Sequence, residues 1–103
     1  MTNRASIDPE CRDAIIAVLE EIPSVQKAVL FGSRAKGTAK PHSDVDIALY
    51  GNVDVFEAED VSCRLNELPF IQKFDVVAFN LVENAELREH IERVGVEIFT
   101  RRL

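Results

Sequence analysis

Two aspartates separated by a single residue begin an apolar, strand-like run, and a Gly-Ser pair precedes them along the chain. The segment reads FGSRAKGTAKPHSDVDIALY over residues 31–50, with ten residues between the Gly-Ser pair and Asp44. Because side chains two residues apart in a β-strand project from the same face, Asp44 and Asp46 are expected to lie together. Apolar side chains would pack on the opposite face: Val45, Ile47 and Leu49. The pattern predicts a strand that is buried on one face and acidic at one end.

Helical and strand-like patterns alternate along the whole chain. Apolar residues recur at helical spacing in three segments: 8–22, 54–68 and 87–94. Runs rich in β-branched and aromatic residues predict four strands: 25–31, 44–50, 73–79 and, as a short edge strand, 96–100. No repeat or linker divides these segments. We therefore expect one domain over residues 1–103, of the α/β (α+β) class, with a small mixed sheet and helices packed on it.

Charge and hydropathy limit the classes of function. The chain has a formal net charge of −6 at pH 7 and a pI of about 4.8, which argues against direct binding to nucleic acid through a basic face. No apolar run is long enough to span a bilayer, and the first residues lack the apolar core of a signal peptide, so we expect a cytoplasmic protein. A local basic group near the glycine turn suits a metal–triphosphate: Arg34, Lys36, Lys40 and His42.

Several other conspicuous side chains predict packing rather than chemistry. Cys11 and Cys63 are too few and too far apart for a zinc ligand set, and both are expected on buried helix stripes as reduced thiols. We also expect Phe56 and Phe70 to pack in the core. His90 is interpreted as a solvated surface imidazole.

The acidic pair favours metal-assisted chemistry. Hard ions such as Mg²⁺ prefer oxygen ligands, and two-metal catalysis needs carboxylates that bridge ions about 3.5–4 Å apart. Asp75 is the candidate third acid, because it lies in the otherwise apolar segment FDVVAF, where a buried carboxylate is costly unless it is paired or bound to metal. In a sheet it would lie beside the strand of Asp44 and Asp46, where it could also serve as general base for an attacking hydroxyl.

The Gly-Ser turn favours phosphate binding. Gly32 allows the backbone to approach a phosphate closely, and the Ser33 hydroxyl can donate to a phosphate oxygen. Arg34 and Lys36 could neutralise phosphate charge, and arginine offers the better geometry for two parallel hydrogen bonds.

Together, Gly32-Ser33, Asp44-x-Asp46 and Asp75 resemble the motif of the DNA polymerase beta nucleotidyltransferase superfamily. The fuller string GSRAKGTAKPHSDVDIAL is most similar to the minimal nucleotidyltransferase branch, which includes the MntA-like antitoxins of HEPN/MNT toxin–antitoxin pairs. The resemblance implies a palm-like core in which Gly32 and Ser33 hold the β- and γ-phosphates and the three aspartates bind two Mg²⁺.

The same resemblance implies transfer of AMP from ATP to a hydroxyl, with release of pyrophosphate. It also implies a helical HEPN-domain protein as partner, with a tyrosine of that toxin as acceptor, and an antitoxin role. No segment beyond the core offers a second lobe for an acceptor, so a partner protein or a second copy is expected to complete the site.

Two other functions stay open on the sequence. One is a binding antitoxin that neutralises its partner by forming a complex, with or without nucleotide. The other is a small-molecule nucleotidyltransferase, which the lack of a substrate-binding lobe disfavours. The base preference and the acceptor hydroxyl are not fixed by the residues.

Overall fold

The structure, a computed structural model, describes residues 7–32 and 44–101. Within them the chain forms, in order, α1 (Pro9–Glu20), β1 (Val25–Phe31), β2 (Val45–Gly51), α3 (Val55–Asn66), β3 (Phe74–Ala78), the 3-10 turn η1 (Phe79–Leu81), α4 (Ala85–Val94) and β4 (Val96–Thr100). The helices and strands expected from the sequence are confirmed, with shifts of one to a few residues at their ends. None of the described helices is long and apolar enough to cross a membrane.

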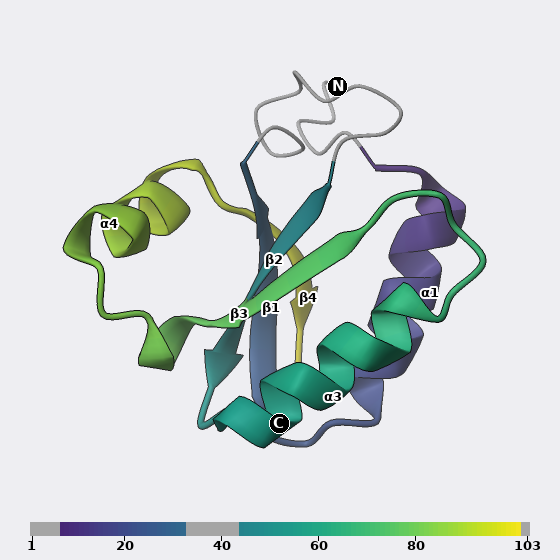
Figure 1. Ribbon diagram of the computed structural model, residues 1–103, viewed down its shortest axis with the longest axis horizontal. Helices are drawn as coiled ribbons and strands as arrows, with labels where there is room; N and C mark the ends of the chain where they lie inside the picture. The colour runs from purple at the N-terminus through teal and green to yellow at the C-terminus, as the bar shows by residue number, and fades with distance from the viewer. Residues whose placement is uncertain (1–6, 33–43, 102–103) are drawn as a thin grey trace.

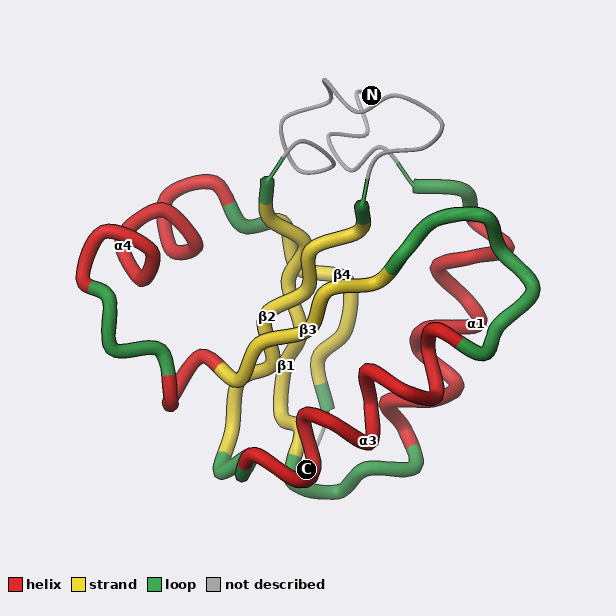
Figure 2. Tube along the Cα trace, in the orientation of Figure 1, coloured by secondary structure: helices red, strands yellow, loops and turns green. Residues whose placement is uncertain are grey.

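The four strands form one mixed sheet in the order β3-β2-β1-β4. β1 is antiparallel to both β2 and β4, whereas β2 and β3 run parallel and are connected through α3. Figure 2 shows that helices flank the sheet on both sides. The fold is the mixed α/β sheet that the sequence predicts, and β4 is an edge strand as expected.

One face of the sheet packs against α1 and α3, which lie together on the same side in Figure 1. The helices contribute fully buried side chains from their apolar stripes: Ile15, Leu19, Val61 and Leu65. β2 meets them with alternate residues, each of them fully buried: Val45, Ile47 and Leu49. The predicted buried face of β2 is therefore confirmed.

Polar contacts fix the ends of this helical layer. The N-terminus of α3 has a capping box, in which the Asp54 carboxylate accepts from the Glu57 amide at 2.8 Å and the Glu57 carboxylate accepts from the Asp54 amide at 3.0 Å. Such caps satisfy backbone donors that the first turn of a helix leaves unpaired. At α1 the equivalent place is taken by Asp8 without a side-chain cap, and Pro9 begins the helix.

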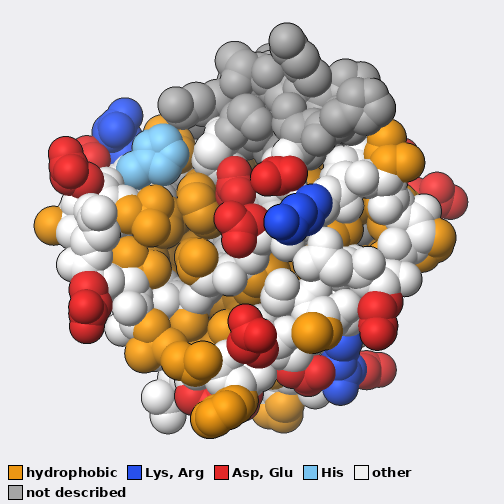
Figure 3. Space-filling model, viewed as in Figure 1, with side chains coloured by type: hydrophobic (Ala, Val, Ile, Leu, Met, Phe, Trp, Pro, Cys, Tyr) orange, Lys and Arg blue, Asp and Glu red, His pale blue; other side chains and the backbone are white. Residues whose placement is uncertain are grey.

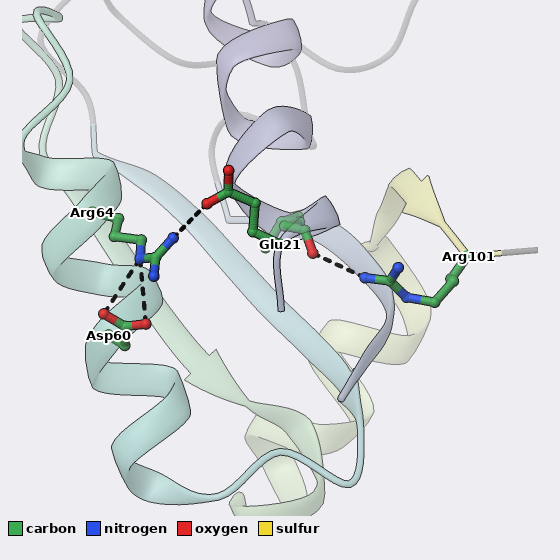
Figure 4. Close-up of polar contacts among 5 residues, drawn as sticks. Glu21, Asp60, Arg64 and Arg101 are labelled. Carbon is green, nitrogen blue, oxygen red and sulfur yellow. Dashed lines mark hydrogen bonds and ion pairs between the residues drawn. The ribbon is translucent and has the colours of Figure 1, made fainter. Parts of the chain in front are cut away.

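Two arginines connect α1 to distant parts of the chain (Figure 4). Arg64 of α3 forms ion pairs with Glu21 at 2.7 Å and Asp60 at 3.3 Å, but these groups are exposed and contribute little to stability. Arg101 follows β4 and donates to three backbone carbonyls at 3.0 Å: those of Leu19, Ile22 and Val25. Arg101 therefore joins the C-terminal strand to the end of α1.

The other face of the sheet is covered only in part, by α4 (Figure 1). Its apolar cluster is smaller and consists of Val29, Phe31, Ala48, Phe79 and Ile91. Near the C-terminal end of β2, the Tyr50 ring stacks on Phe79 with ring centres 4.4 Å apart, and the Lys27 ammonium lies 4.3 Å from the centre of the Tyr50 ring.

Three expectations about packing are wrong. Cys63 is exposed, because it lies two residues and about 200° round α3 from the buried Val61. Phe56 is 82% exposed in the first turn of the same helix. His90 is half-buried, with its ring against Phe31 at 6.3 Å between centres, rather than solvated. The other expectations hold: Cys11 is buried, and Phe70 packs partly buried against the core.

Candidate active site

The three predicted acids lie on the partly covered face of the sheet. Asp46 is paired directly with Asp75 in the parallel register of β2 and β3, and with Phe31 in the antiparallel register of β1 and β2. Asp44 comes immediately before β2, two residues from Asp46. Because β1 ends where β2 and β3 begin, the acids and the glycine turn meet at one end of the sheet. Figure 3 shows a group of acidic side chains on this side of the molecule.

Asp46 is the central and most buried of the three carboxylates. Asp46 is half-buried, whereas Asp44 and Asp75 are exposed. Burial raises the pKa of Asp46 above its usual value of 3.8, and the nearby negative charges of Asp75 and then Asp44 raise it further. Ionisation of Asp46 is therefore less favourable in the folded chain than ionisation of an isolated aspartate.

The structure gives a different reason for placing Asp75 in the site than the sequence does. The sequence predicts a buried carboxylate, but Asp75 is exposed although its neighbour Phe74 is buried. β3 has only one fully covered face, and Asp75 lies on the other. Its pairing with Asp46, rather than its burial, is what brings it to the acidic group.

The donor set fits a hard divalent cation. It consists of carboxylate oxygens, and Asp46 makes no ion pair with any residue in the described ranges. Within residues 7–32 and 44–101, no three such side chains already converge to metal-binding distance. Three anions at closer range would repel one another, so their convergence needs a cation between them. Asp44, Asp46 and Asp75 are the described residues that would hold it.

Gly32 lies against the central acid. Its φ is +75°, a conformation that residues with side chains rarely adopt. A Cβ atom at this position would clash with the carboxylate of Asp46. Glycine therefore lets the end of β1 pass close to the Asp46 carboxylate, and phosphate binding by this turn stays a prediction. The other residues predicted to bind phosphate lie outside the described residues: Ser33, Arg34 and Lys36.

Sequence reasoning missed Lys73, which also belongs to this end of the sheet. The backbone carbonyl of Lys73 accepts from the Val45 amide at 2.9 Å, so the pairing of β2 and β3 extends to this residue. Lys73 is therefore placed across from Asp44 and two residues from Asp75. The alternation that places Asp44 with Asp46 could have identified it.

A model of one protein family matches residues 13–102, described as polymerase beta, nucleotidyltransferase. This chain belongs to that family. A curated relative from Methanocaldococcus jannaschii, provisionally named as a protein adenylyltransferase, is 36% identical over 63 residues. That match covers 61% of this chain and 58% of the relative.

Solved structures of similar fold come from toxin–antitoxin complexes. A chain in a toxin–antitoxin crystal structure with AMP-PNP superposes with a TM-score of 0.75 at 24% identity, covering 88% of this chain and 74% of that one. A chain in the structure of a tri-AMPylated Shewanella oneidensis HEPN toxin with its MNT antitoxin gives 0.69 at 21% identity, covering 89% and 71%. At these identities the likeness shows the fold, and it confirms the polymerase-beta-like core expected from the sequence.

Proposed function

We propose that this nucleotidyltransferase is Mg²⁺-dependent and moves AMP from ATP to a tyrosine hydroxyl of a HEPN-domain toxin, thereby acting as its antitoxin. The observation that carries the proposal is the half-buried Asp46, flanked by Asp44 and Asp75 and covered by the Gly32 turn. This arrangement joins a cation-binding group to a phosphate-binding turn at one end of a sheet.

The chemistry follows from the positions of the acids. Bound Mg²⁺ would supply a Lewis acid and shield the charge of the triphosphate. Asp44, Asp46 and Asp75 would hold the ions, while Gly32, Ser33 and the basic residues Arg34 and Lys36 would bind the β- and γ-phosphates. Asp75 accepts the acceptor's proton, the hydroxyl oxygen bonds to the α-phosphorus, and the bond from that phosphorus to pyrophosphate breaks.

A protein acceptor is supported by two of the relatives. One is named for protein adenylylation, and another occurs in a complex in which the HEPN toxin carries AMP. The partly covered face of the sheet also supports a protein acceptor, since an acceptor brought by another protein can reach acids that α4 does not cover. The small-molecule alternative has no comparable support among these relatives.

Intact mass spectrometry tests the proposal. The purified protein is incubated with ATP and Mg²⁺, with and without a HEPN-domain protein as the proposed partner. We expect the HEPN-domain protein to gain one or more AMP units with the wild type and none with Asp46→Asn, while circular dichroism shows the variant folded.

The same experiment separates catalysis from binding. If the HEPN-domain protein gains no mass with the wild-type protein but forms a stable complex that neutralises it, the binding antitoxin is the correct function. Neutralisation that persists in the Asp44→Asn/Asp46→Asn double variant would lead to the same conclusion.

A further inference from the structure

Lys73 is a cation in the acidic end of the sheet that the proposed mechanism does not yet use. Its backbone pairs with the start of β2, and residues 73, 75 and 77 alternate with the inward-facing Phe74. Lys73 therefore belongs to the same face as Asp75 and is opposite Asp44. Figure 3 shows a basic side chain bordering the acidic group on this side.

The Lys73 ammonium group has no charged or hydrogen-bonding partner among the described residues. Lys73 is exposed and forms no ion pair or side-chain hydrogen bond with any described residue. The other cations on this face have structural partners: Lys27 lies over Tyr50, and Arg88 donates to the carbonyls of Phe79 and Val82. Lys73 thus differs from them, because it lies at the acidic end of the sheet and has no structural partner among the described residues.

The order of the strands places Lys73 on the side opposite the phosphate turn. Gly32 follows β1, Asp44 and Asp46 are at the start of β2, and Lys73 precedes β3, so Asp44 and Asp46 lie between Gly32 and Lys73. Neighbouring strands are about 4.8 Å apart, which puts the backbones of Gly32 and Lys73 about 10 Å apart across the sheet. β3 is also an edge strand in the described sheet. A group that enters over this edge meets Lys73 and Asp75 before it meets Asp44 and Asp46.

We propose that Lys73 is the acceptor-side cation of the active site, contacting the attacking hydroxyl oxygen of a protein acceptor. This role rests on the proposed function. As the acceptor O–H gives its proton to Asp75 and the oxygen bonds to the α-phosphorus of ATP, the oxygen carries growing negative charge. The ammonium group of Lys73 stabilises that charge and keeps its own protons, and pyrophosphate leaves with the electrons of the broken P–O bond.

Steady-state kinetics with the HEPN-domain protein as acceptor test this role. Lys73→Met is expected to lower kcat/KM for the acceptor about 10- to 100-fold, the loss of one charge-assisted hydrogen bond. The Kd of Mg–ATP, measured by calorimetry without acceptor, should stay within about twofold, because the phosphates bind at the β1 side. Lys73→Arg should recover most of the loss, since it keeps the charge.

Lys27→Met is the matched control, because it removes the same charge from the same face at the far end of the sheet. It should leave kcat/KM for the acceptor unchanged. A Mg–ATP affinity that falls with Lys73→Met would overturn the acceptor-side role in favour of a phosphate ligand. Unchanged kinetics would identify Lys73 as a solvated surface residue. A wild-type protein that transfers no AMP would instead overturn the proposed function, and this role with it.

Discussion

The two faces of the sheet are built from the same strands but are covered very differently. The face under α1 and α3 is filled with fully buried aliphatic side chains, and Phe74 completes it at the edge strand. The face under α4 has a smaller apolar cluster and ends in three carboxylates. Phe74 and Asp75 are adjacent in the chain and belong to opposite faces.

This difference separates stability from chemistry. A layer of two helices removes most of one face from water, and that burial is the main source of stability in a small domain. α4 covers the other face only in part, and the acids lie at the end of that face where the proposed nucleotide and acceptor would bind. A substitution on the face under α1 and α3 should therefore lower stability more than activity. A substitution at the acidic end of the face under α4 should lower activity more than stability.

Of the changes at Gly32, Phe74 and Asp75, Asp75→Asn should have the largest effect on activity. We expect AMP transfer to fall about 1,000-fold, because the change removes a metal ligand and the general base together. The free energy of unfolding should change by less than about 0.5 kcal/mol, since the side chain is exposed. Initial rates and urea denaturation measure the two quantities, and a large loss of stability with normal transfer would reverse the assignment of the faces.

Phe74→Ala, one residue earlier, should show the opposite result. Removal of a buried phenyl ring costs about 3–5 kcal/mol of unfolding free energy. Transfer per folded molecule should stay close to that of the wild type at low temperature, where enough of the variant is folded. Phe74→Leu is the milder control, and a variant that is stable but inactive would place chemistry on the filled face.

Gly32→Ala tests the close approach of the turn to the acids. Alanine at a positive φ costs about 1–2 kcal/mol, and its methyl group would push against the Asp46 carboxylate. We expect transfer to fall about 10- to 100-fold, with a smaller loss of stability than Phe74→Ala. Gly95→Ala is a control for a glycine outside the acidic end, because it crowds Val29 and the carbonyl of Ile91 instead. Equal transfer by Gly32→Ala and the wild type would exclude the turn from the site.

The raised pKa of Asp46 predicts how stability without metal depends on pH. The folded chain binds this proton more tightly than the unfolded chain, so ionisation of Asp46 opposes folding at neutral pH. Asp46→Asn should therefore raise Tm at pH 7 by about 1–3 °C, a modest gain because the group is half-exposed. The gain should shrink as the pH falls through the raised pKa and vanish below the usual value of 3.8. Calorimetry at several pH values checks this, and a lower Tm for the variant at pH 7 would contradict it.

Phe56→Ser should have the smallest effect. The side chain is 82% exposed, so the free energy of unfolding should change by less than about 0.5 kcal/mol. Val61→Ser in the same helix is the contrasting change, since Val61 is fully buried. Chemical denaturation of both variants makes the comparison, and a large loss with Phe56→Ser would show that the first turn of α3 is packed more tightly than the structure shows.

The sequence predicts the helices and strands better than it predicts which of their side chains are buried. Period-two alternation places Val45, Ile47 and Leu49 on one face and Asp44 with Asp46 on the other, because this relation is local. Exposure of Asp75 and Phe56 depends on which surfaces α3 and α4 reach, and that is decided by contacts between distant residues.

The structure brings together only some members of the predicted site, and the role of each stays a prediction. Pairing of β2 with β3 brings Asp75 to Asp46, as expected, and Gly32 has the backbone conformation that a phosphate turn requires. Ser33, Arg34 and Lys36 stay predictions, because they lie outside the described residues. Lys73 was missed although alternation along the predicted strand 73–79 places it with Asp75, because only the register of β2 and β3 shows that it lies across from Asp44.

The most direct test is the binding of Mn²⁺, a paramagnetic substitute for Mg²⁺. It asks whether the acidic end of the face under α4 is the metal–nucleotide site. Electron paramagnetic resonance measures free Mn²⁺ in titrations of the wild type and Asp46→Asn, each with a non-hydrolysable ATP analogue. We predict that the wild type binds Mn²⁺ with the analogue and that Asp46→Asn loses at least about tenfold in affinity while it keeps its fold. Equal binding of Mn²⁺ by the two proteins would contradict the account.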